Sequence, residues 1–416
     1  MAPKTGVLAL VVALDLFAVS LVVPLLPIRY KELGVQPVMI GFIGSIYSAA
    51  QIVGGLVFGV VGDRLPDRRY VLLVSFAGAA ISYSLVGLAS EVWVLAVSRA
   101  VVGLVKQTMT ASKAMTLQWS DETTRASALG LISSATTVAW VTGSAVTGYV
   151  RSISLSAPSV LAVGLYAVCT ALVLLVLPPT PPTSLAETRL GVAAATAAAA
   201  APPPPREGFF TKARRVFGTK AIGGFLALKV LYQLVLRAGG SMQTQWEMDR
   251  FGLDVGKLGY LSTGKALLSV TFNALLAGRA IQYFGEQAAF RLGLAAAVLG
   301  AAAEAAVIGE ADVWAYALLC VPAKLVAGLL AGLALEASMA RLVPKSELGT
   351  SLSVLDVLSS ACGVVAPVLA GAAMQWGGLP TVPLLAAAGH AAVLALSFVA
   401  LPSSLRAAGD GAKKTE

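Results

Sequence analysis

Long apolar stretches separated by short polar segments set the pattern of the whole chain. Twelve stretches of about 20 mainly apolar residues follow one another, and a helix of that length crosses roughly 30 Å of hydrocarbon. In lipid only helices and closed barrels satisfy the backbone, and these long runs lack the alternation of barrel strands. The pattern predicts an all-α membrane protein with twelve transmembrane helices. The expected spans are 6–28, 38–61, 70–89, 92–114, 126–150, 158–177, 221–243, 258–280, 288–308, 313–338, 350–375 and 380–401.

A segment of different composition divides the twelve spans into two sets of six. Residues 178–220 combine prolines, a run of alanines and a basic end, which is typical of a flexible linker. We therefore expect an N-terminal six-helix half at 1–177, a cytosolic linker at 178–220 and a C-terminal half at 221–405. Residues 406–416 are expected to form a cytosolic tail.

Composition and charge support an integral, multi-pass membrane protein. Hydrophobic residues make up 57% of the 416 residues and charged residues only 12%, too few for an ordinary aqueous surface. The net charge of +9 would suggest nucleic acid for a soluble protein. Here Lys and Arg gather on one side of the predicted membrane, which places both termini and the linker in the cytosol and leaves no reason to expect a nucleic-acid partner. The sequence does not separate plasma from organelle membrane.

Few residues are suited to metal, disulfide or catalytic chemistry. The chain has one histidine and three cysteines, and all four lie inside apolar stretches. We expect no metal, no cofactor and no disulfide framework. No nucleophile–base cluster supports an enzyme.

The two halves resemble each other in sequence. Arg99–Gly103 in the fourth span parallels Lys324–Gly328 in the tenth, and the preceding loops, 91–93 and 312–314, have the same acidic-Val-Trp pattern. Two pseudo-symmetric halves with a site at the membrane midplane is the architecture of many secondary transporters.

The loop between the second and third spans carries the sharpest motif. Residues 59–69 read Gly-Val-Val-Gly-Asp-Arg-Leu-Pro-Asp-Arg-Arg. This loop resembles the signature of the major facilitator superfamily, with Pro66 in place of a glycine. A generic charged loop is the alternative reading. The resemblance implies the major facilitator fold, and it implies a gating role for Gly59, Asp63, Arg64, Arg68 and Arg69.

Other segments resemble the twelve-helix drug:proton antiporters of this superfamily. The first span around Asp15 and the fourth around Arg99 match their patterns, which makes these two residues candidates for proton coupling. Residues 143–148 resemble the antiporter motif, but Ser144 and Thr147 replace a proline and a glycine, so the resemblance does not decide for antiport. The resemblance covers nearly all of the chain outside the linker. Residues 15–26 and 106–114 are most similar to a eukaryotic orphan branch of the superfamily, whose substrate the resemblance does not supply.

Charged residues within the spans are candidates for function, because charge inside a bilayer is costly without a partner or water. Arg99, Lys106 and Lys113 are seven residues apart, so one continuous helix would present all three on one face, toward a central cavity. Lys106 could instead form a structural ion pair, and Lys113 could extend to the cytosolic surface. Cations outnumber acids in the full set, which is Asp15, Arg99, Lys106, Lys113, Lys229, Arg237, Lys265, Glu304, Lys324, Glu336 and Asp356.

Roles within this set follow from depth and charge. The candidates for the substrate cavity are Arg99, Lys106, Lys229 and Lys324. Asp15 could carry a proton or neutralise a cation such as Lys229, and Glu304 could pair with Lys324.

The sequence therefore indicates a secondary active transporter that moves a small organic solute by alternating access, with proton coupling as an option. The excess of cations favours an anionic solute, whereas the antiporter resemblance favours a hydrophobic or cationic one. A non-transporting receptor or scaffold on the same fold is the alternative. The expected partners are the solute, protons and the lipid bilayer, and we expect a monomer.

Overall fold

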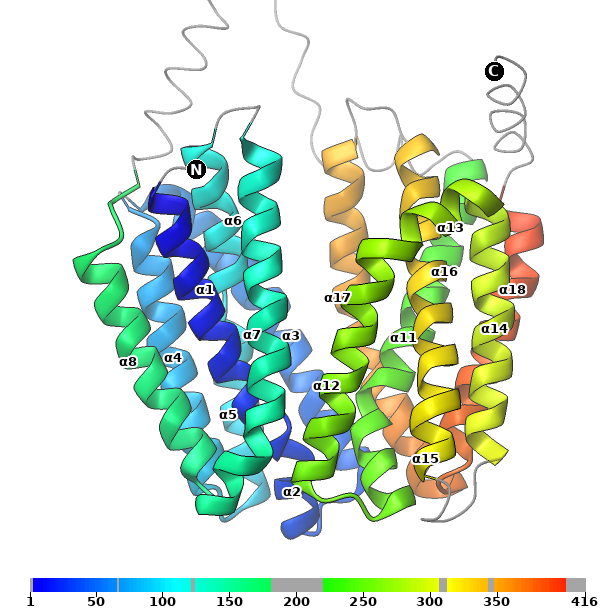
Figure 1. Cartoon of the computed structure of the whole chain (residues 1–416), viewed down its shortest axis with the longest axis horizontal. Coiled ribbons are helices and arrows are strands. Elements are labelled where there is room, and N and C mark those ends of the chain that lie inside the picture. Colours follow the sequence, from blue (N-terminus) through cyan, green and yellow to red (C-terminus); the bar gives the residue numbers. More distant parts are fainter. Residues whose placement is uncertain are drawn as a thin grey trace, which may run out of the picture. The chain divides into compact units, whose positions relative to one another are not determined.

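The computed structural model describes residues 3–65, 67–120, 124–180, 220–306, 313–342 and 348–401. Within these ranges the chain is helical and has no strand (Figure 1). Most of the predicted linker, at 181–219, and the predicted tail lie outside the described residues.

Two compact units divide the chain, and each is described by itself. The first comprises residues 1–35, 46–206 and 255–263, and the second comprises 36–45, 207–254 and 264–416. The helices that lie wholly or mainly in the first unit are α1 (Pro3–Val22), α2 (Leu25–Glu32), α3 (Pro37–Arg64), α4 (Arg69–Leu88), α5 (Val92–Val105), α6 (Thr108–Trp119), α7 (Arg125–Ile153) and α8 (Ala157–Leu175).

The second unit holds the remaining helices and two π-helical turns. They are α11 (Lys220–Phe251), α12 (Val255–Thr271), η1 (Phe272–Leu276), α13 (Ala277–Phe284), α14 (Glu286–Ala306), α15 (Val313–Ala315), η3 (Tyr316–Cys320), α16 (Val321–Leu342), α17 (Leu348–Gly377) and α18 (Thr381–Ala400). The first residues of α12 belong to the first unit and the first residues of α3 to the second.

Ten helical segments among the described residues are long and apolar enough to cross a membrane. The seventh and eighth predicted spans, 221–243 and 258–280, are helical but are not among these ten. In α11, Lys229, Gln233 and Arg237 interrupt the apolar sequence, and the π-helical turn η1 interrupts the eighth span. Polar side chains in a span are tolerated where they face protein or water, which directs attention to what these residues contact.

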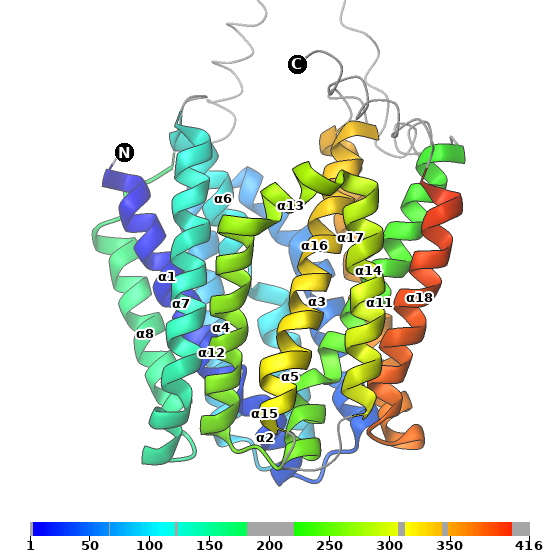
Figure 2. The ribbon, with the colours of Figure 1, turned by 45° about the vertical axis from the view of Figure 1, so that its right-hand side comes forward.

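Small residues allow α1 and α7 to approach closely in the first unit (Figure 2). A Cβ atom at Gly143 would lie 1.8 Å from the Ser20 hydroxyl oxygen and 3.0 Å from the Phe17 carbonyl oxygen. Thr147, one turn further along α7, donates a hydrogen bond to the Ser20 carbonyl at 3.1 Å. Close packing of small residues with hydroxyl hydrogen bonds is how helices associate in membranes without a hydrophobic driving force. In this structure residues 143–148 therefore have a packing role.

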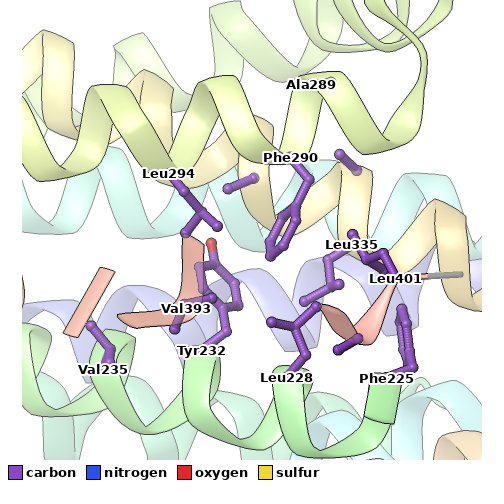
Figure 3. Close-up of a cluster of buried hydrophobic side chains, with 13 residues drawn as sticks. Phe225, Leu228, Tyr232, Val235, Ala289, Phe290, Leu294, Leu335, Val393 and Leu401 are labelled. Atoms are coloured by element: carbon purple, nitrogen blue, oxygen red, sulfur yellow. The ribbon is translucent and has the colours of Figure 1, made fainter. Parts of the chain in front are cut away.

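The second unit has an apolar core formed by α11, α14, α16 and α18 (Figure 3). Phe290 of α14 packs edge-on against Tyr232 of α11, with ring centroids 5.9 Å apart. The Tyr232 hydroxyl donates to the Gly328 carbonyl at 2.9 Å, so its polar end is satisfied. A Cβ atom at Gly293 would meet the α16 backbone at 2.8 Å, which shows how closely α14 and α16 pack. This core fixes the helices that carry the polar groups described below.

The fourth span is broken, and the prediction of one continuous cationic face is wrong. Helix α5 ends at Val105, where Lys106 leaves the helical region with ψ 82°, and α6 begins after Gln107. Ser75 of α4 bridges the break, since its hydroxyl donates to the Val105 carbonyl at 2.7 Å and accepts the Gln107 N–H at 3.0 Å. Backbone groups freed by a break inside a membrane need such partners. Lys113, on α6, is exposed.

Candidate functional site

Charged side chains inside the spans are largely arranged as ion pairs. Each pair joins a lysine to a carboxylate of a different helix, and within the described residues the pairs are Lys106–Asp15, Lys229–Glu336, Lys265–Glu247 and Lys324–Glu304. Pairing reduces the cost of placing charge in hydrocarbon, so these lysines are not uncompensated cations.

The pair in the first unit joins α1 to the break in the fourth span. Asp15 is fully buried and its Oδ1 accepts from the ammonium group of Lys106. The same ammonium group lies 3.3 Å from the Tyr166 hydroxyl and 5.0 Å from the ring centroid. Asp15 thus neutralises Lys106, where the sequence suggested a cation such as Lys229. Its Oδ2 is buried and has no hydrogen-bond partner among the residues that the structure describes.

Arg99 lies about two turns before the break and is surrounded by hydroxyl and aromatic groups. Its guanidinium donates to Ser98 Oγ at 3.3 Å and to Ser82 Oγ at 3.2 Å, and it lies 5.7 Å from the centre of the Tyr83 ring. No carboxylate among the described side chains pairs with it. Arg99 is therefore a buried cation held by neutral groups.

Gln243 of α11 is the centre of a buried network in the second unit. Its Nε2 lies 2.6 Å from Glu304 Oε1, 2.8 Å from the Tyr316 hydroxyl and 3.2 Å from Glu247 Oε1. Its Oε1 accepts from Lys324 Nζ at 2.9 Å. An amide carries only two N–H groups, so the 3.2 Å contact is the weakest of the three. Gln243 thereby links two ion pairs that come from four different elements.

The two glutamates of this network are almost completely buried. Glu304 of α14 accepts from Lys324 of α16 at 2.5 Å, and their side chains are 1% and 26% exposed. Glu247 of α11 accepts from Lys265 of α12 and from the Tyr316 hydroxyl at 2.6 Å. The predicted pair of Glu304 and Lys324 is confirmed. Tyr316 begins the π-helical turn η3, and π-turns inside helices are frequent at functional sites.

A cavity of about 490 Å³ lies against this network, inside the second unit. Lys265, Lys324 and Gln243 line it, together with His390 and Glu336, and the remaining wall is mainly glycine and aliphatic side chains. Lys265 and Lys324 are part of the cavity lining, whereas their partners Glu247 and Glu304 are not. An apolar pocket with a few convergent polar groups is typical of a small-molecule site.

His390 forms part of the cavity wall, and one of its ring nitrogens has a hydrogen-bond partner. Its Nδ1 lies 2.7 Å from the Ala386 carbonyl oxygen, and its ring meets Tyr232 edge-on at 6.4 Å. Glu336 of the cavity wall forms an ion pair with Lys229, and 3.4 Å separate its Oε1 from Lys229 Nζ. Within the described residues no three metal-ligating side chains gather at one point.

The loop between α3 and α4 is tied to the segment that follows α8. Asp67 accepts from Arg69 Nε at 2.5 Å and from the Thr180 hydroxyl at 2.9 Å, and the Arg68 N–H donates to Thr180 Oγ1 at 2.8 Å. Arg69 also donates to the Leu177 carbonyl at 2.8 Å. Burial raises the pKa of Asp67, but these hydrogen bonds outweigh it and the net pKa is lowered. The side chains of Asp63 and Arg64, and that of Asp356, are outside the described part of the structure.

Three residues of the site did not emerge from the sequence: Gln243, Glu247 and Tyr316. The seventh span was predicted to end at 243, but α11 continues to Phe251. Gln243 and Glu247 are four residues apart, so they share one helix face, and this spacing was the available signal.

The Major Facilitator Superfamily profile matches residues 8–333. Tetracycline resistance protein, class C, of Escherichia coli is 27% identical over 412 residues, which are 97% of each chain. The crystal structure of the human organic anion transporter MFSD10 (TETRAN) has a TM-score of 0.63 at 19% identity, covering 95% of this chain and all of that one. The crystal structure of the nucleoside transporter NupG has a TM-score of 0.73 at 13% identity, covering 96% and 98%.

The profile covers well over half of the chain, and the structural likenesses show the same fold. Ten candidate spans among the described residues agree with an integral, multi-pass membrane protein. Members of this family are secondary active transporters of small molecules. This chain belongs to the Major Facilitator Superfamily and is a secondary active transporter.

Proposed function

We propose that the transporter moves a small organic anion, whose acidic group binds Lys324 and Lys265 in the cavity of the second unit. The observation that carries this proposal is the layering of charge. Lys265 and Lys324 line the cavity with partly exposed side chains, while the carboxylates that balance them are almost completely buried and are not part of its lining. A solute with an acidic group therefore meets cations first, and its apolar part meets the aliphatic wall.

The alternative substrate class is a hydrophobic or cationic drug, suggested by the antiporter resemblance and by the name of the tetracycline resistance relative. One acidic side chain, Glu336, lines the cavity and offers a cation some attraction. Its partner Lys229 offsets this charge, so the lining as a whole favours the anion. The human structure named as an organic anion transporter shows that this fold can serve that chemistry.

Matched pairs of probes test the substrate class directly. Benzoate and hexanoate should raise the thermal unfolding temperature of purified protein, whereas benzylamine and hexylamine should not, because ligands that bind only the folded state stabilise it. Lys324→Ala should abolish the stabilisation, and Lys113→Ala, at an exposed lysine of α6, should leave it intact. Stabilisation by the amines but not by the acids would overturn the anionic assignment.

Arg99 and Lys106 complete the proposed cation set of the first unit, and Asp15 and Arg99 are the proposed proton-coupling residues there. Asp15 is buried, and its Oδ2 has no hydrogen-bond partner in the described part of the chain, which leaves that oxygen available to a proton. Asp15→Asn should then uncouple solute accumulation from a pH gradient in proteoliposomes. Accumulation equal to the parent would remove Asp15 from the coupling mechanism.

The loop of residues 59–69 is proposed to gate the transport cycle. The residues proposed to act in gating are Gly59, Asp63, Arg64, Arg68 and Arg69. Asp63→Asn should slow transport while leaving solute affinity nearly unchanged. An unchanged transport rate would show that the loop does not gate.

We also propose a membrane orientation, an oligomeric state and a branch of the superfamily for this chain. The halves 1–177 and 221–405 flank a cytosolic linker at 178–220, both termini are cytosolic, and the protein acts as a monomer. Within the superfamily we place the chain nearest the eukaryotic orphan called major facilitator superfamily domain-containing protein nine. Labelling from outside intact cells of a cysteine introduced into the linker would contradict the orientation.

A further inference from the structure

We propose that Glu304 takes up a proton when an organic anion binds Lys324, so that solute and proton are bound together in the second unit. This inference rests on the proposed function, because it takes the anion and the cavity as given. It adds a proton site in the second unit, separate from the Asp15 and Arg99 proposed for the first, and the number of protons bound there with each solute. Solute and proton then occupy the site together, in contrast to an exchange in which one displaces the other.

The two ends of the Glu304–Lys324 pair face different surroundings. Glu304 is 1% exposed, and each of its oxygens has one partner, Gln243 at 2.6 Å and Lys324 at 2.5 Å. The side chain of Lys324 is 26% exposed and lines the cavity. An anion in the cavity can therefore reach Lys324 without reaching Glu304.

Binding of the anion leaves the two lysines with three carboxylates, Glu247, Glu304 and that of the solute. When the solute carboxylate takes Lys324 as its partner, Glu304 keeps only the neutral amide of Gln243. A buried carboxylate without a counter-ion and beside a second anion is strongly disfavoured, and protonation removes its charge. A proton from water adds to the Glu304 carboxylate to give the acid, Lys324 keeps its proton, and no other bond changes.

The proton is assigned to Glu304 because the second glutamate is better supported. Without its lysine, Glu247 would still accept from the Tyr316 hydroxyl at 2.6 Å, and at 3.2 Å it would share the Gln243 N–H that is directed at Tyr316. Glu304 would accept from one neutral donor, Gln243. The acid form of Glu304 can also donate its new proton to the solute oxygen that has replaced it at Lys324.

Every element packed against α14 near Glu304 contributes to its surroundings. The titratable and charged groups near it are Lys324 of α16, Tyr316 and Cys320 of η3 and Glu247 of α11, and His390 of α18 lies close enough to Lys324 to interact with its charge. Lys265 balances Glu247. Helix α13 also packs on α14 but joins it at the opposite end, at Gly285. Of these groups only Glu304 loses its counter-ion when the solute carboxylate binds Lys324.

Proton uptake in weakly buffered solution tests the proposal on the whole purified protein. Benzoate or hexanoate, added at matched pH, should remove close to one proton from solution for each anion bound. The apparent Kd should rise about tenfold per pH unit on the alkaline side, as linkage of one proton to one ligand requires. Glu304→Gln carries a neutral side chain in place of the acid, so it should bind the anion without proton uptake and with no pH dependence.

Two further variants separate the possible outcomes. Glu247→Gln should keep the proton uptake, and Glu91→Gln, at an exposed position before α5, should behave as the parent. Anion binding without proton uptake by the wild-type protein would overturn this inference and leave the proposed function standing, and this holds even where a variant fails to fold. The inference would also be overturned if proton uptake were lost in Glu247→Gln but kept in Glu304→Gln. Absence of binding by either acid would instead overturn the proposed function.

Discussion

Asp15 and Lys106, 91 positions apart in the sequence, form a buried ion pair that joins α1 to the break in the fourth span. The Asp15 side chain is fully buried and that of Lys106 is 13% exposed. A lysine at the end of a helix, where the backbone turns away, is held in place by a carboxylate on a neighbouring helix. The pair thus fixes the position of a charged group at a discontinuity, the kind of place where transporters build their sites.

Removing Lys106 should be more harmful than removing both members of the pair. Lys106→Ala leaves Asp15 buried without its counter-ion, which costs about 3 kcal/mol or more. The double variant Asp15→Asn with Lys106→Ala should recover part of that loss, because no uncompensated charge remains. Thermal unfolding in detergent of the parent, both single variants and the double variant gives the coupling energy. Simple additivity of the two single effects would show that the residues do not interact.

Ser75→Ala should destabilise the break in the fourth span. It removes one acceptor and one donor, so the Val105 carbonyl and the Gln107 N–H lose the partner that Ser75 supplies, at a cost of about 1–3 kcal/mol. Ser45→Ala is a matched control, since Ser45 is also buried but, among the described residues, its hydroxyl donates to the Gly41 carbonyl of its own helix alone. The unfolding temperature should fall for Ser75→Ala much more than for Ser45→Ala. Equal shifts would mean that Ser75 does not hold the break.

Gly143→Ala should disrupt the packing of α1 against α7. The added Cβ atom would overlap the Ser20 hydroxyl and press on the Phe17 carbonyl, so Ser20 must turn out of its hydrogen bonds or the helices must separate. Gly130→Ala in the same helix meets nothing within 4 Å and should be neutral or stabilising, because alanine favours helix by about 1 kcal/mol over glycine. The yield of monodisperse protein and its unfolding temperature measure both. Equal behaviour of the two variants would contradict the close approach.

The Asp67 contacts should stabilise the loop between α3 and α4 above acidic pH. Hydrogen bonds from Arg69 and Thr180 lower the pKa of Asp67 below its usual 3.8, despite the burial that raises it. A lowered pKa in the folded state means that the stabilisation is complete above the unfolded pKa and is lost as the pH falls through the folded one. Asp67→Asn should therefore be less stable than the parent near neutral pH, and the difference should shrink only below about 3.8. A difference in unfolding temperature that is already lost near neutral pH would contradict this account.

Much of the architecture follows from the sequence because lipid imposes simple rules. Long apolar stretches can only be helices in hydrocarbon, so the all-α membrane fold follows from the hydrophobic pattern alone. The loop motif and the similarity of the two halves point to the major facilitator fold. The Glu304–Lys324 pair could also be predicted from the sequence, since a buried acid and a buried cation on adjacent spans are expected to form an ion pair.

Only the tertiary structure decided which charges are paired and which face a cavity. The spacing of Arg99, Lys106 and Lys113 indicates one helix face, but the contact of Ser75 with Val105 and Gln107 allows the helix to break between them. That exchange of hydrogen bonds involves residues 30 and 32 positions apart, which no local pattern contains.

The buried network of the second unit has the same origin. Gln243 meets Lys324 and Glu304 only because α14 and α16 pack closely around small residues such as Gly293 and Gly300. The sequence determined how many charges the membrane must accommodate. Packing decided their partners, because the energy of a buried charge depends on the few ångströms around it and those neighbours come from distant parts of the chain.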